Sequence, residues 1–409
     1  MENMVVAGLD IGTTKVACII AEAGDDGELK LTGVGNCSSD GGLRKGVVVD
    51  IDKTVRAIKA AVEQAELMAG VDLDSVWAGI AGEHIKSMSS TGPVAITQEV
   101  TQADIERAIE SAKAIDIPAN YEMLHVITQG FRIDQQDGIK NPLGMGGVRL
   151  ETQVHIITAQ ATRLQDLAKC VERAGLKLNK LVLEPLASSY AVLGKDEKEL
   201  GVALIDIGGG TTDVAVYVDG NICHAAIVGL GGENVTRDIG QILRCPLEKA
   251  EDLKKKSGCA FQPLLRGDEK IVIPGLAGRD DKESGRELLV GVIEARVEEI
   301  LSLAMREIKK TQYFDMLGAG VVLTGGGSMM EGMREKAENV FQRPVKIGVP
   351  RGFGGLAEAA KSPMYSTGIG LCMFAAEEIA RDCRDGKKRG GGSGQSILGK
   401  MKDFFGKYF

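Results

Sequence analysis

The chain has 409 residues, and its apolar fraction of 44% and charged fraction of 26% are ordinary for a soluble globular protein of several subdomains. A net charge of −8, without a broad lysine and arginine face, argues against a general nucleic-acid-binding protein. The eight cysteines form no CxxC pair, which favours buried thiols in a reducing cytoplasm over disulfides or zinc. We expect no signal peptide, because the N-terminus leads straight into a strand, and no transmembrane helix, because no apolar run approaches about 20 residues.

Residues 4–83 are expected to form a β-rich frame containing one helix. The strands MVVAGLD, TKVACIIAE and LKLTGVGN precede a helix over 52–69, whose apolar residues share one face, and the strand VWAGIAG follows it.

Residues 84–164 have a different pattern of expected elements, which predicts a small α+β insertion. Its expected elements are two short strands (HIKSMSS and GPVAITQ), a helix that begins at Thr101 and Asp104, and two longer strands over 122–133 and 150–158.

The frame resumes after the insertion with a helix over 161–174, the strand LNKLVLE, a helix over 185–193 and the strand ELGVALID. Past residue 231 we expect two helices, an irregular glycine- and aspartate-rich stretch, a long amphipathic helix, the strand GAGVVLTGG with another helix behind it, and a final helix. The ranges that the pattern defines in this part are 234–243, 246–256, 258–285, 287–310 and 364–382.

Two glycine turns of the same design, one in each half of the chain, carry the clearest functional signal. Each follows an apolar strand ending in an aspartate and leads through hydroxyl residues into a second strand. Glycines let the backbone approach a ligand closely, and consecutive N–H and O–H donors can surround an anion. The pair predicts two phosphate hairpins closing on one nucleotide, with Mg²⁺ held through water by Asp10 and Asp206. The predicted phosphate-binding residues are Gly12, Thr13, Thr14 and Lys15, and Gly208, Gly209, Gly210 and Thr211.

A third glycine turn, VVLTGGGSMM, is expected to open a helix and to pack along the sugar and α-phosphate of ATP. Polar residues of the helix AEDLKKKSG are expected to recognise adenine and ribose, and the junction at Gly232 and Glu233 to contact the ribose hydroxyls. For any single triple glycine, a tight turn without a ligand is the alternative. Three turns together favour one ATP site, whose further residues are Gly325, Gly326, Gly327, Ser328, Glu251, Lys254 and Ser257.

Two charged residues have both a functional and a structural interpretation. Glu184 ends the strand LVLE where the two halves are expected to meet, so it is a candidate for orienting water toward a γ-phosphate. The alternative is a carboxylate that merely stabilises a helix N-terminus. Lys15 is placed to neutralise phosphate charge, and the alternative is a solvated strand lysine.

The C-terminus combines a flexible linker with an amphipathic segment. Residues 384–395 are charged and glycine-rich, which predicts a linker that does not fold. On a helix, seven side chains of SILGKMKDFFGKYF fall within an arc of about 140°, bordered by lysines. This pattern favours a helix on an anionic membrane surface, and the alternative is a helix that docks on the protein's own body. The seven side chains are those of Ile397, Leu398, Met401, Phe404, Phe405, Tyr408 and Phe409.

Five segments together resemble the signature of the actin, sugar-kinase and heat-shock chaperone ATPase superfamily: the two hairpins, LEPLASSY, VVLTGGGS and YSTGIGL. The insertion and the tail make the chain similar, within it, to the FtsA family of bacterial cell-division proteins. The resemblance implies an α/β, actin-like two-lobed ATPase fold of duplicated ribonuclease-H-like domains, with an inserted subdomain 1C and a C-terminal amphipathic helix. The expected parts are 1A (1–83 and 165–200), 1C (84–164), 2A (201–230 and 311–362), 2B (231–310), a final helix (363–383), the linker (384–395) and the membrane helix (396–409).

This resemblance also implies a function. An ATP-binding protein of this family is expected to polymerise into actin-like filaments on the cytoplasmic side of the cell membrane at the septum, to tether the FtsZ ring there, and to hydrolyse ATP slowly at most. The FtsZ C-terminal peptide would bind subdomain 2B, for which Arg296, Glu299 and Arg306 are the candidate wall. Other division proteins would bind subdomain 1C. No nucleic-acid partner is expected.

Three alternatives share the frame. A small-molecule kinase would need an acceptor-binding subdomain, which is not evident, and has no obvious use for a membrane tail. A PilM-like pilus-assembly adaptor has a similar insertion but is not expected to carry the terminal helix. A chaperone would need a β-rich peptide-binding domain after the ATPase frame.

Overall fold

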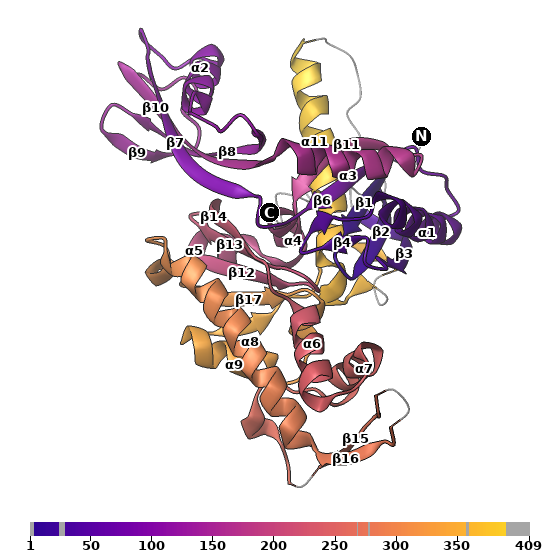
Figure 1. Cartoon of the computed structure of the whole chain (residues 1–409). Helices are drawn as coiled ribbons and strands as arrows, with labels where there is room; N and C mark the ends of the chain where they lie inside the picture. Colours follow the sequence, from indigo (N-terminus) through magenta and orange to yellow (C-terminus); the bar gives the residue numbers. More distant parts are fainter. Residues whose placement is uncertain (1–3, 24–28, 268, 277–278, 357–359, 390–409) are drawn as a thin grey trace.

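The computed structural model describes residues 4–23, 29–267, 269–276, 279–356 and 360–389, which form two lobes and a projecting subdomain (Figure 1). The first lobe is built on a six-stranded sheet in which β1, β2 and β3 are antiparallel neighbours and β6 and β11 extend the sheet in parallel. Its strands, in spatial order, are β11 (Lys177–Leu183), β6 (Ser75–Ile80), β1 (Met4–Ile11), β2 (Lys15–Ala23), β3 (Leu29–Ser38) and β19 (Gly354–Gly355).

The second lobe repeats this design. Three antiparallel strands are again followed by two parallel ones, which confirms the predicted duplication. The spatial order is β14 (Asn221–Val228), β13 (Thr212–Val218), β12 (Val202–Ile207), β17 (Val321–Thr324) and β18 (Val345–Ile347). The strands β12 and β13 are wholly buried, as their continuous apolar sequences require.

Helices cover both sheets. In the first lobe, α1 lies directly on β3, because a Cβ atom at Gly33 or Gly35 would overlap the α1 backbone, and α11 packs on α4 and β1. The first-lobe helices are α1 (Ile51–Ala69), α3 (Ala161–Arg173), α4 (Glu184–Val192) and α11 (Ser366–Arg389), and the short helix α5 (Lys195–Leu200) packs on β13 of the second lobe. The second lobe has α6 (Gly232–Leu243), α7 (Leu247–Ser257), α8 (Arg286–Lys309) and α9 (Met333–Phe341), together with the hairpin β15 (Lys270–Ile273) and β16 (Lys282–Gly285).

The inserted subdomain has its own sheet and small apolar cores. Its order is β7 (Lys86–Ala95), β10 (Arg149–Gln160), β8 (Tyr121–Ile133) and β9 (Gln136–Ile139), with α2 (Gln102–Lys113) packed on β7 and β10. The predicted start of α2 is confirmed, because Thr101 and Asp104 form a capping box. The connections β4 (Leu43–Arg44) and β5 (Val47–Val48) and the 3₁₀ turns η1 (Gln262–Leu264), η2 (Phe314–Met316), η3 (Gly326–Met329) and η4 (Pro363–Tyr365) complete the described elements.

Three predicted elements differ from the structure. The two short strands expected in the insertion are one strand, β7, because Gly92 does not break it: the position lies under α2, where a Cβ would overlap the carbonyl oxygen of Ala108. The stretch 258–285 is not wholly irregular, since it contains η1 and the β15–β16 hairpin. The final helix ends at Arg389 rather than near 382, so the linker predicted to begin at 384 is helical in its first residues.

The longer helix has a compositional reason. Residues 383–389 contain one glycine among charged residues with good helix propensity, and the glycine cluster begins at position 390. The rest of the predicted linker and the amphipathic segment 396–409 lie outside the described residues. Among the helices of the described part, none combines the length and the apolar character that crossing a bilayer requires.

Candidate nucleotide-binding site

The two glycine hairpins have the same local geometry and meet tip to tip. The Gly12 amide donates to the Lys15 carbonyl at 3.0 Å, and the Gly208 amide donates to the Thr211 carbonyl at 3.0 Å. A Cβ atom on Gly209 would overlap Thr14 Oγ1, so these two turns contact each other directly. The predicted pairing of the hairpins across the seam of the two lobes therefore exists, and glycine is required for their close approach.

Asp206 is held by residues from two distant segments. Ser188 Oγ on α4 donates to Asp206 Oδ2 at 2.6 Å, Thr367 Oγ1 on α11 donates to the same oxygen at 3.3 Å, and the two hydroxyls lie 3.0 Å apart. Gly325, with φ of 81°, lies against the carboxylate so closely that a Cβ there would overlap Oδ1. The segments LEPLASSY, VVLTGGGS and YSTGIGL thus converge on one strand-end aspartate.

Four buried carboxylates interact at this place. Burial raises the pKa of Asp10 to about 6, Lys15 opposes the rise and Asp206 adds to it. Burial also raises the pKa of Asp206, against the hydrogen bonds from Ser188 and Thr367. The pKa values of Glu184 and Asp213 lie well above their usual range, first through burial and then through the charges of neighbouring carboxylates. Glu184 was predicted to lie where the two halves meet, and the charges of Asp10, Asp213 and Asp206 that act on it place it there.

Asp213 is a site residue that the sequence analysis did not assign. It lies on β13 directly after the second hairpin, is 3% exposed, and within the described residues its Oδ1 has no hydrogen-bond partner. The signal that would have found it is an aspartate immediately after Thr211 and Thr212, at a position that an all-apolar buried strand would otherwise fill.

The carboxylates fit a divalent cation. Burying several negative carboxylates together costs free energy unless a cation compensates their charge. Asp213, whose Oδ1 has no hydrogen-bond partner within the described residues, interacts with the charges of Asp206 and Asp10. Within the described residues, no three histidine, cysteine or acidic side chains are grouped for direct ligation of one metal ion. Asp10 and Asp206 would hold Mg²⁺ through its retained waters, and Mg²⁺ would supply charge neutralisation of phosphate oxygens.

Lys15 is not a solvated strand lysine. Its Nζ donates to the Met364 carbonyl at 2.9 Å and lies 4.3 Å from the ring centroid of Tyr365, whose hydroxyl accepts from Asn36 Nδ2 at 3.3 Å. Burial lowers the pKa of Lys15, while Asp10 and Asp206 oppose that change. The ammonium therefore links the first hairpin to the segment that leads into α11.

The third glycine turn differs in detail from its prediction. It opens the short 3₁₀ turn η3, and the α-helix behind it begins only at Met333. Ser328 Oγ donates to the Gly325 carbonyl at 2.7 Å, so this hydroxyl closes its own turn, and a Cβ on Gly327 would overlap Ile207. At Gly326, by contrast, the nearest atom beyond its chain neighbours is Met364 Cβ at 4.0 Å. Gly326 is the glycine that leaves room for a ligand.

The residues predicted to recognise base and ribose form one polar network. Lys254 Nζ donates to the Gly232 carbonyl at 3.0 Å and forms an ion pair with Glu251 at 2.6 Å, and Thr236 Oγ1 donates to Glu251. The amides of Gly232 and Glu233 donate to the carbonyls of Gly208 and Gly209 at 2.9 and 2.8 Å. This network joins α7, the α6 N-terminus and the second hairpin. Ser257 lies at the end of α7, where its carbonyl accepts from Arg286 Nε at 2.8 Å.

Family comparisons agree with this architecture. The family model "Cell division protein FtsA" matches residues 203–370, and "SHS2 domain inserted in FTSA" matches residues 82–158, which corresponds to the predicted insertion. The cell division protein FtsA of Pseudomonas aeruginosa is 46% identical over 374 residues, covering 91% of this chain and 89% of that protein. The chain belongs to the FtsA family of cell-division proteins. The FtsA of Escherichia coli K12 is 39% identical over 416 residues, covering 100% of this chain and 99% of its own.

Solved structures show the same fold at low identity. A PilM-PilN type IV pilus biogenesis complex matches with a TM-score of 0.64 and 16% identity, covering 91% of this chain and 98% of that chain. MreB5 of Spiroplasma citri bound to AMPPNP matches with a TM-score of 0.57 and 15% identity, covering 94% and 100%. These likenesses confirm the actin-like two-lobed fold. The sequence relatives support the FtsA family over the PilM-like alternative.

Gly326→Val should abolish measurable ATP binding while leaving the fold intact, because the added side chain fills the space beside Met364 in which the sugar is expected to lie. Gly209 is a less informative position, since a side chain there also collides with Thr14. Calorimetric titration with Mg-ATP measures the effect, and the control is Gly285→Val, where nothing lies within 4 Å of the added Cβ. An affinity within about tenfold of wild type, or 1.4 kcal/mol, contradicts the site.

Glu184→Gln should retain ATP binding and lower the basal ATPase rate by at least about tenfold, since a neutral amide of the same shape cannot accept a proton from an attacking water. Single-turnover phosphate release, measured with both proteins saturated by Mg-ATP, separates the chemical step from binding. An unchanged rate would remove Glu184 from the mechanism and leave it as a buried structural carboxyl group.

Proposed function

We propose that this FtsA-family protein binds Mg-ATP between its lobes, polymerises on the cytoplasmic face of the cell membrane at the division septum, and tethers the FtsZ ring there while recruiting later division proteins. The observation that carries the nucleotide part is the tip-to-tip meeting of two matched glycine hairpins beside four buried carboxylates. Family membership supplies the role in division.

ATP would act mainly as the ligand that joins the lobes. Asp10 and Glu184 belong to the first lobe, whereas Asp206 and Asp213 belong to the second, so their mutual repulsion opposes closure. A divalent cation and the donors of both hairpins would favour the closed arrangement by binding it preferentially. Hydrolysis, at most slow, would then limit the lifetime of the closed subunit rather than serve metabolism.

The second lobe offers a groove for the FtsZ C-terminal peptide. A groove of about 510 Å³ lies between α6 and α8, with Ile242 and Leu288 exposed in it. Arg296 and Glu299, two of the three wall residues predicted from sequence, line it and form an ion pair, and Arg296 Nε also bonds Asp238 at 2.5 Å. Arg306, the third, is exposed on α8 but does not line this groove. An apolar floor edged by charges suits a short amphipathic peptide.

Leu288→Lys should weaken binding of the FtsZ C-terminal peptide at least about tenfold, because it places a charge where an apolar anchor would sit. Fluorescence anisotropy with a labelled peptide gives the affinity. Val272→Lys is the matched control: Val272 is similarly exposed, at 54% against 51%, and lies on β15 of the same lobe outside the groove. Equal loss in both variants, or in neither, contradicts the groove as the docking site.

Membrane attachment rests on the sequence of residues 396–409, which lie outside the described part. Large apolar side chains contribute roughly 1.5–3 kcal/mol each at full burial, and partial burial and ordering of the linker reduce the sum to a reversible attachment for one tail. A filament presents many tails at high effective concentration, so polymers should bind membranes far more strongly than monomers.

Phe404→Glu should release the protein from anionic vesicles without affecting ATP binding, because it puts a charge within the apolar arc. Gly406→Glu adds the same charge to the same segment about 60° beyond the nearest edge of that arc on a helix of about 100° per residue, and should retain binding. Co-sedimentation with liposomes decides between them. If a chain ending at Asp382 pellets as well as the full chain does, the tail is not the anchor.

A further inference from the structure

The inserted subdomain, although it belongs to the first lobe, is bonded to the edge strand of the second. Ser87 Oγ on β7 donates to the Ala225 carbonyl on β14 at 2.9 Å, and the Ala225 amide donates back to the same hydroxyl at 3.4 Å. Gln129 Nε2 on β8 donates to the Ile222 carbonyl at 2.9 Å. Figure 1 shows the subdomain above β14, so this contact is a second seam between the lobes, away from the hairpins.

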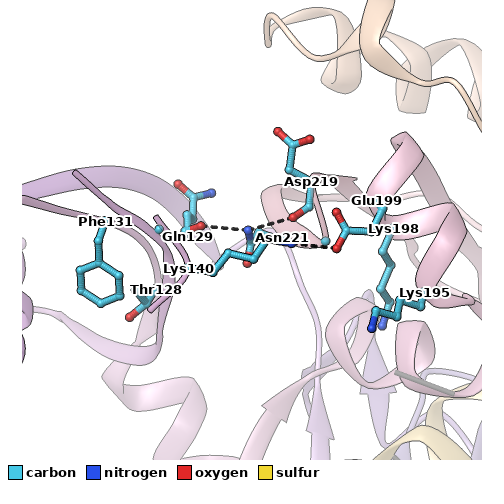
Figure 2. A pocket seen from close by; sticks show the side chains of 11 residues that line it. Thr128, Gln129, Phe131, Lys140, Lys195, Lys198, Glu199, Asp219 and Asn221 are labelled. Atoms are coloured by element: carbon cyan, nitrogen blue, oxygen red, sulfur yellow. Dashed lines mark hydrogen bonds and ion pairs between the residues drawn. The ribbon is translucent and has the colours of Figure 1, made fainter. Parts of the chain in front are cut away.

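This seam is polar and joined mainly by side chains. Asn221 Nδ2 donates to the Gln129 carbonyl, and Lys140 forms an ion pair with Glu199, both at 2.9 Å (Figure 2). These four residues border a cavity of about 400 Å³. In the described sheets β14 pairs with β13 on one side and with no strand on the other, so no β-ladder crosses the seam. Contacts between domains of this polar kind commonly open and close.

Two histidines lie within the seam. His155 on β10 is 2% exposed, and His224 on β14 is its electrostatic neighbour. Within the described part of the chain, both ring nitrogens of His155 lack a hydrogen-bond partner, and so does Nε2 of His224. Glu307 on α8 and Lys310 directly after this helix, which pair with each other at 2.6 Å, are the charged groups that act on His224. Within the described residues, no acceptor is therefore arranged to take a hydrogen bond from the ring of a charged His155.

Charging either imidazole therefore opposes docking. Burial, and to a smaller extent His224, lower the pKa of His155 to about 4. Burial also lowers the pKa of His224, where Glu307 opposes the shift and Lys310 adds to it. In an undocked seam both rings would meet water and take their ordinary pKa near 6.5. The docked state binds fewer protons, so docking is strongest above about pH 6.5 and weakens as the pH falls toward 4.

We propose that the inserted subdomain is a pH-sensitive latch: with His155 and His224 neutral it holds β14 of the second lobe, and protonation of the pair releases it. Between pH 7.5 and 5.5 the docking equilibrium falls about tenfold through His155, and protonation of His224 lowers it further. Release frees one lobe from the other at this seam, which makes relative lobe motion sensitive to acidification.

The amide of Ala225 reports the latch, because it donates across the seam to Ser87. Its hydrogen-exchange protection in the full chain, corrected for the intrinsic rate at each pH, should fall at least about tenfold from pH 7.5 to 5.5. Amides of the central strand β12 serve as the internal reference and should keep their protection. An equal fall in β12 means general unfolding and overturns the proposal.

Histidine variants assign the effect. His224→Leu should leave the roughly tenfold pH effect of His155, His155→Leu should leave only the part that His224 contributes, and the double variant should abolish the effect. These variants should fold, because an apolar replacement removes buried nitrogens that have no hydrogen-bond partner within the described residues. If the double variant does not fold, each single variant still tests the proposal. His84→Leu is the matched control: His84 is also buried and unpaired, with a pKa lowered to about 4, but faces Gly82 rather than β14. The latch is contradicted if the protection of the Ala225 amide in the wild-type protein does not change with pH. It is also contradicted if the full pH effect remains in the His155 and His224 variants.

Discussion

Repulsion among four buried carboxylates at the meeting of the lobes is the constraint on which the rest of the structure depends. Desolvation raises the pKa values of Asp10, Glu184, Asp206 and Asp213, neighbouring carboxylate charges raise those of Asp10, Glu184 and Asp213 further, and Lys15 opposes the rise for Asp10 and Asp206. Such a cluster costs free energy unless a cation and its ligand compensate it. Since two of the groups come from each lobe, whatever neutralises them also favours bringing the lobes together.

Contacts from several segments of the chain hold these carboxylates in place. Ser188 and Thr367 fix Asp206 from α4 and α11, and Lys15 reaches the backbone just before α11. The same helix continues to Arg389, toward the predicted membrane segment. A change at the hairpins therefore has a direct mechanical connection to the helix that leads to the tail, through two hydroxyls and one ammonium group.

Sequence patterns predicted the local parts of this arrangement and missed the long-range ones. The two hairpins were predictable because a glycine turn between an aspartate and hydroxyl residues encodes its own backbone geometry. Ser188, Thr367 and Asp213 were not assigned, since their roles depend on contacts between segments far apart in the chain. The strand β7 was predicted as two short strands, because the sequence does not show that Gly92 continues one strand and admits α2. Ser328 was assigned to a ligand because its hydroxyl type fits, whereas its geometry closes a turn.

The two lobes meet at two seams that respond to charge in opposite ways. The hairpin seam buries carboxylates and would be favoured by a bound cation, whereas the seam under the inserted subdomain buries His155 and would be disfavoured by its protonation. Both contain buried polar atoms without partners, Oδ1 of Asp213 in one and the ring nitrogens of His155 in the other. A structure selected only for stability would replace such groups with apolar ones. Asp213 and His155 both lie where the lobes meet, so the protonation or ligation of these groups bears directly on how the two lobes are joined.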